Sequence, residues 1–151
     1  MATIVKLGSG IREFTFAFDE TASGESVTVR FNPTNMLFAE KLFGTFDEMD
    51  AIGDKYMKQL DSVEDGKELF SITRAAEKDM REKLNALFGT DICTPLFGEY
   101  ESVYASDGDG LPVWATILLA TIDEMDANFV AEKEKTNPRI KKYTAKYNRR
   151  K

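Results

Sequence analysis

Two acidic segments of this sequence have the residue types of a calcium-binding loop. The first is Asp107-Gly108-Asp109-Gly110, and the second begins at Asp61 and has a glycine at its sixth position. An EF-hand loop needs glycine at position six and a carboxylate at position twelve. Counted from Asp107, these positions hold Pro112 and Leu118, and the count from Asp61 fails at positions three and twelve. Both segments are therefore predicted to be solvated loops, and no metal site is expected.

Few other side chains could take part in a reaction. The chain has no His, which is the commonest general base and zinc ligand. Cys93 is the single cysteine, so it cannot form an intramolecular disulfide, and we predict a buried, inert thiol in a reducing cytoplasm. Gly8-Ser9-Gly10 is not followed by a helical pattern and is not a phosphate-binding loop. We therefore predict no catalytic residue and no cofactor, and expect that the chain is not an enzyme.

The strongest chemical signal is a separation of charge along the chain. Residues 1–136 contain 13 basic and 26 acidic residues, a net charge of about −13, whereas residues 137–151 carry +7 and no acidic residue. The predicted partner-binding residues are the seven cations of this tail, Arg139, Lys141, Lys142, Lys146, Arg149, Arg150 and Lys151. Their partner should be acidic, either a neighbouring copy or a client protein. Nucleic acid is disfavoured because the acidic body repels phosphate. The alternative is a solvated, frayed terminus.

The first secondary structure predicted along the chain is a sheet. Ile4, Val5 and Leu7 are apolar, and apolar side chains then alternate with polar or small ones over residues 14–18 and 27–31. This period of two is typical of strands with one buried face. The face is predicted to contain Phe14, Phe16, Phe18, Val27, Val29 and Phe31. Short links between the three segments predict an N-terminal three-stranded antiparallel meander.

Three longer helices and one short one are predicted to cover this sheet. The first should start at Asn32-Pro33 and run to about residue 60, with Gly44 and Gly53 as points of weakness. The second should run from a cap at Asp65 to a stop at Gly89. A short helix is expected within residues 90–98. The last should run from near Pro112 to a point before Pro138, since the residue preceding proline disfavours helix.

These elements define one α+β domain over residues 1–136, followed by a basic C-terminal tail over residues 137–151. No segment has an apolar run long enough to cross a membrane.

One stretch of the sequence resembles a known family. Residues 88–98, Phe-Gly-Thr-Asp-Ile-Cys-Thr-Pro-Leu-Phe-Gly, place two Phe-Gly pairs around a short segment, after a charged amphipathic helix. Arg30-Phe31-Asn32-Pro33 joins a strand to a long helix, and Trp114 and Ile117 lie in a later helix. Over residues 26–130 this pattern resembles the tail assembly chaperones of siphophages that infect Gram-positive bacteria.

The resemblance implies a role in binding rather than catalysis. Chaperones of that family coat the long, helical, hydrophobic tape measure protein and keep it soluble until the tail tube polymerises around it. Some of their genes encode a longer product by ribosomal frameshifting near the 3′ end, and the basic tail lies where that extension would begin. No functional residue is carried over from the family.

We therefore expect a phage tail assembly chaperone in the host cell cytoplasm. Its partners should be the tape measure protein or another tail protein, together with further copies of itself. The alternative is a small acidic inhibitor or DNA mimic that occupies the basic site of a nucleic-acid enzyme. The acidic body suits that alternative, and the +7 tail argues against it. The neighbouring genes would discriminate between the two.

Overall fold

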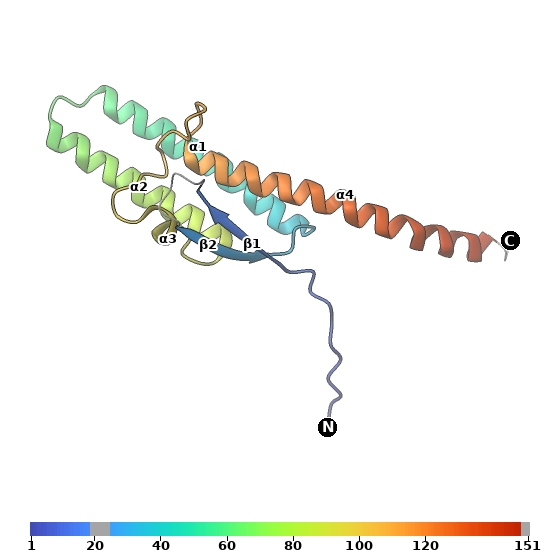
Figure 1. The fold of residues 1–151 in the computed structure, drawn as a ribbon. Coiled ribbons are helices and arrows are strands. Elements are labelled where there is room, and N and C mark those ends of the chain that lie inside the picture. The colour runs from blue at the N-terminus through green and yellow to red at the C-terminus, as the bar shows by residue number, and fades with distance from the viewer. Residues whose placement is uncertain (19–24, 149–151) are drawn as a thin grey trace.

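The computed structural model describes residues 1–18 and 25–148, and the side chains of residues 1–18 and 25–131. Two strands, β1 (Arg12–Ala17) and β2 (Ser26–Phe31), precede four helices. These are α1 (Met36–Asp61), α2 (Gly66–Phe88), α3 (Cys93–Phe97) and α4 (Val113–Asn148). In Figure 1, α1 and α2 form an antiparallel pair, the two strands lie at one end of it, and α4 runs beside α1 and extends beyond the body. The α+β class is confirmed, as are the three longer helices and the short one.

The sheet has two strands in the described residues, and the prediction of a three-stranded meander is not confirmed. β1 and β2 pair antiparallel, with Phe14 opposite Val29 and Phe16 opposite Val27. Residues 4–7 form an extended segment outside any sheet, and Figure 1 shows it leading away from the body. Apolar residues there suit a strand, but a strand also needs a neighbouring backbone to bond with, and the sequence pattern does not supply one.

The buried face of the sheet is as predicted. Val29 and Phe31 are buried, and the other four predicted side chains are half-buried against the core. The Phe16 ring meets Phe88 edge to face with centroids 5.5 Å apart, and the Phe31 ring stacks on Phe38 at 4.6 Å. The sheet therefore packs on the end of α2 and the start of α1.

The first long helix begins three residues later than predicted. Asn32 does not cap it: its side-chain oxygen accepts hydrogen bonds from the amide and hydroxyl of Thr34, which closes a tight turn at Pro33. Asn35 is the cap, and its side chain accepts a hydrogen bond from Leu37 N at 3.0 Å. The helix then continues through Gly44 and Gly53 without a break. Gly53 is buried, and a Cβ there would lie 3.1 Å from the Tyr104 ring, so the glycine permits close packing.

The second and third helices match their sequence signals. Asp65 caps α2 by accepting a hydrogen bond from Lys67 N at 3.0 Å, and Gly89 ends it with a left-handed φ of 69°. This backbone conformation is the reason for glycine at the stop. α3 is limited to Cys93–Phe97 and ends at Gly98.

The prediction that the last helix ends before Pro138 is wrong. α4 runs through Pro138 to Asn148, so residues 137–148 of the predicted tail continue it. A proline removes one backbone hydrogen bond and crowds the preceding turn, at a cost of about 3 kcal/mol. The other turns on each side keep their hydrogen bonds, so a helix can continue past it.

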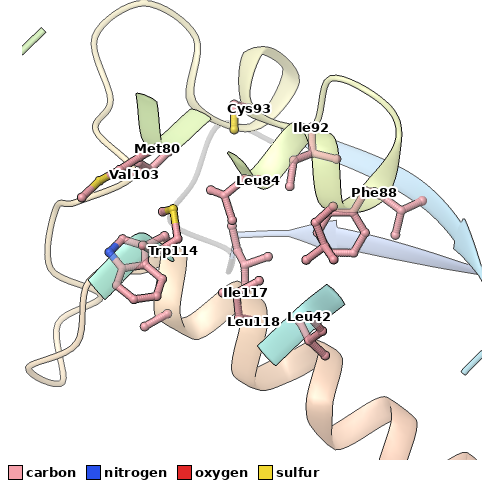
Figure 2. Close-up of a cluster of buried hydrophobic side chains, with 14 of the residues drawn as sticks. Leu42, Met80, Leu84, Phe88, Ile92, Cys93, Val103, Trp114, Ile117 and Leu118 are labelled. Atoms are coloured by element: carbon pink, nitrogen blue, oxygen red, sulfur yellow. The ribbon is translucent and has the colours of Figure 1, made fainter. Parts of the chain in front are cut away.

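The core lies where α2, α3 and α4 meet α1 (Figure 2). Leu42, Leu84 and Leu118 have no exposed surface and come from three different helices. Trp114 packs edge to face on Phe46 with ring centroids 5.2 Å apart, which joins the start of α4 to α1. This packing fixes the direction in which α4 leaves the body.

Candidate partner-binding surfaces

The Asp107 loop satisfies its own carboxylate. Asp107 accepts hydrogen bonds from Asp109 N at 2.7 Å, from Leu111 N at 3.2 Å and from the Thr116 hydroxyl at 3.0 Å. The bond from Asp109 N is the main reason that the pKa of Asp107 is lowered. The carboxylate thus holds the turn that precedes α4. Within the part of the chain that the structure describes, no group of three or more His, Cys, Asp or Glu could hold a metal ion.

Cys93 has the environment of an unreactive thiol. The residue is completely buried, and burial raises the pKa of its thiol to about 12. The thiolate is the reactive form, so little of it exists near neutral pH. The predicted buried thiol is confirmed.

Glu77 and Arg81 form the ion pair that their spacing of four residues on α2 predicts, but the pair is half-buried, and the bonds of Glu77 to the loop after α3 were not anticipated from the sequence. Glu77 pairs with Arg81 at 2.9 Å, and its carboxylate also accepts hydrogen bonds from the Ser102 hydroxyl at 2.7 Å and Val103 N at 2.9 Å. Arg81 in turn donates to the Glu101 carbonyl at 2.8 Å. A pocket of about 270 Å³ lies beside this network. Both carboxylate oxygens accept hydrogen bonds from groups of the chain, and these bonds tie the loop after α3 to α2.

A second unanticipated contact fixes the sheet to the last helix. The Arg12 guanidinium donates to the Asn128 side-chain oxygen at 2.6 Å, and the Asn128 amide donates to the Glu124 carbonyl at 2.7 Å. Asn128 is buried and follows Thr121 and Met125 on the buried side of α4. An amide at a buried helical position is the signal that could have indicated a polar partner.

The N-terminal segment exposes large apolar side chains. Ile4, Val5 and Leu7 are between 74% and 87% exposed. We call residues 1–8 the N-terminal arm. The arm makes no pairing with β1 or β2, and the first side-chain hydrogen bonds to the body are at Ser9, whose carbonyl accepts from Asn32 at 3.1 Å. These exposed side chains are available for apolar contacts with another molecule.

One side of α1 is exposed along its whole length and has a regular pattern. Its eight positions follow each other at alternating steps of four and three residues, and all are exposed. We call them the α1 stripe: Met36, Glu40, Phe43, Asp47, Asp50, Asp54, Met57 and Asp61. Three are large apolar side chains between 49% and 65% exposed, and five are acidic. Such a stripe has the spacing of a helix–helix seam.

The structure describes the backbone of four of the seven predicted partner-binding cations. Arg139, Lys141, Lys142 and Lys146 belong to the backbone of α4, whereas Arg149, Arg150 and Lys151 lie outside the described residues. Figure 1 shows this part of α4 leading away from the body. The helical segment 139–148 is therefore carried away from the acidic body of its own chain.

The comparisons with known proteins add no relative to these observations. No family model, no curated protein and no solved structure matches this chain. Among the described residues, no helix is long and apolar enough to cross a membrane.

Proposed function

We propose that this protein is a non-enzymatic phage tail assembly chaperone that binds the tape measure protein in the host cell cytoplasm. The observation that carries the proposal is the N-terminal arm, whose three apolar side chains are exposed beside an acidic body. A chaperone of a long hydrophobic helix must offer apolar contacts to its client. It must also keep the complex in solution, which a strongly negative body favours.

The geometry supports protein binding more than the alternative of a DNA mimic. A phosphate mimic needs an array of carboxylates that matches a phosphate backbone. On the α1 stripe, the carboxylates share one surface with Met36, Phe43 and Met57, which are apolar groups suited to a protein surface. The tape measure protein is proposed as the client because residues 26–130 resemble the chaperone family.

Co-expression tests this function. The protein is produced together with a candidate tape measure protein, and the soluble fraction of that client is measured. A variant with Ile4, Val5 and Leu7 replaced by Ser should leave the client in the pellet, because the apolar contacts are lost. A matched variant with three other exposed side chains, Phe70, Tyr100 and Val130, replaced by Ser should behave as the unchanged protein.

Two results would contradict the proposal. If the client is equally insoluble with and without the unchanged protein, the chaperone function is wrong. If the arm variant keeps the client as soluble as the unchanged protein does, the arm is not the contact.

A further inference from the structure

The α1 stripe has two parallel rows with different chemistry. One row, at a spacing of seven residues, contains Met36, Phe43, Asp50 and Met57, and the adjacent row contains Glu40, Asp47, Asp54 and Asp61. The first row is mainly apolar, and every member of the second is acidic. A helix that packs on this stripe should therefore have an apolar row with a basic row beside it.

The C-terminal segment of this same chain has that pattern. Ile140, Tyr143 and Tyr147 follow each other at steps of three and four residues in the sequence. Each of these three residues directly follows a cation, and these cations form a second row with the same spacing: Arg139, Lys142 and Lys146. The segment contains no acidic residue, so its charge is opposite to that of the acidic row on α1.

Geometry decides between contact within one chain and contact between two. α4 is a continuous helix to Asn148, and Figure 1 shows its C-terminal part directed away from α1 and the body. A straight helix cannot turn back onto the same molecule. The segment can therefore reach the α1 stripe of another copy and not its own.

We propose that the α1 stripe binds the basic segment 139–148 of a second copy of this protein. This gives a surface to the self-association that belongs to the proposed function, but it does not depend on the identity of the client. The contact joins two different surfaces, so in a pair one copy keeps its stripe free and the other keeps its basic segment free, and association proceeds past a dimer or closes into a ring. The contact covers only about three helical turns, so we expect it to be weak and favoured at low salt.

The test is charge reversal with rescue, using the full chain alone in sedimentation velocity over a range of protein concentrations. One variant carries D47K, D54K and D61K, a second carries R139E, K142E and K146E, and a third combines all six. At about 0.05 M salt, the unchanged protein should associate and each triple variant should weaken association about tenfold or more. The combined variant should recover association, because the two rows again have opposite charge.

Matched controls separate this contact from general electrostatics. E64K, D79K and E99K make the same change in net charge at exposed positions outside the stripe, and should leave association within about twofold of the unchanged protein. Phe43 and Phe70 are both exposed phenylalanines on helices. F43A should weaken association, because Phe43 lies on the stripe, and F70A should not.

Three results would overturn the proposal: a monomer at all concentrations at low salt, failure of the combined variant to recover association, or equal losses in the stripe and control variants. The arm variant provides the distinction from the function itself. If self-association fails in this way while the arm still determines client solubility, the α1 contact is wrong and the chaperone function stands.

Discussion

At the scale of single residues, Glu77 holds more of the structure together than its sequence position suggests. Its side chain is 20% exposed, and it accepts hydrogen bonds from Arg81, Ser102 and Val103. Glu77→Ala would leave these donors without their acceptor, and we expect it to lower the free energy of unfolding by about 2–3 kcal/mol. Glu48→Ala is the matched control, because Glu48 forms an ion pair with Lys83 at 2.8 Å but is 52% exposed. That loss should be about 1 kcal/mol or less. Urea unfolding measures both, and equal losses would contradict the role of Glu77.

Cys93 should make the stability sensitive to high pH. Burial keeps its thiol protonated in the folded chain up to a pKa of about 12, whereas the ordinary value is 9.0. Between these values the unfolded chain loses the proton and the folded chain retains it, so the free energy of unfolding should fall as pH rises from 9 towards 12. Urea unfolding at pH values below and within this range should show a smaller decrease for Cys93→Ala than for the unchanged protein. Rapid modification of Cys93 by a thiol reagent in the native protein would show that the thiol is accessible and the expectation wrong.

At the scale of elements, the segment before β1 is where the two-stranded sheet of the structure differs from the predicted three-stranded sheet. The N-terminal arm lies outside the β1–β2 pair, and the contacts of the chain with its core begin after it. Deleting residues 2–7 should therefore leave the melting temperature unchanged, because no core contact or strand pairing is removed. Differential scanning calorimetry measures this directly. A deletion that also removes Ser9 and Gly10 is the comparison, because it takes away the hydrogen bond from the Asn32 side chain to the Ser9 carbonyl. A substantial decrease on removal of residues 2–7 alone would show that the arm pairs as a third strand in solution.

At the scale of the whole molecule, charge is divided between an acidic body and a helix that carries cations away from it. We expect a chain that ends at Thr136 to melt at the same temperature as the full chain, because every core residue among the described side chains precedes that point. Light scattering should show weaker association for the shortened chain at about 0.1 M salt, and no difference at about 1 M, where the Debye length is about 3 Å. A large decrease in melting temperature would instead place the end of α4 in packed structure. Equal association at low salt would make residues 137–151 a passive terminus.

The sequence alone determined the features that depend on near neighbours in the chain. The alternation of Phe14 and Phe16, the cap at Asp65 and the stop at Gly89 are local signals, and the structure has each of them as predicted. The cations of residues 139–151 and their separation from the acidic body are likewise evident from composition.

Tertiary structure decided which backbone groups find a partner far away in the chain. Among the described residues, the segment that contains Ile4 has no strand to pair with. Asn128 accepts a hydrogen bond from Arg12, and Glu77 accepts one from Ser102, which lies 25 residues further along the chain. Tertiary structure also kept α4 helical through Pro138, where a local rule predicted an end. The α1 stripe needed both levels: its spacing is in the sequence, but its exposure follows from where α2 and α4 pack. Local periodicity shows which side chains share a face, and only packing shows which face remains in water.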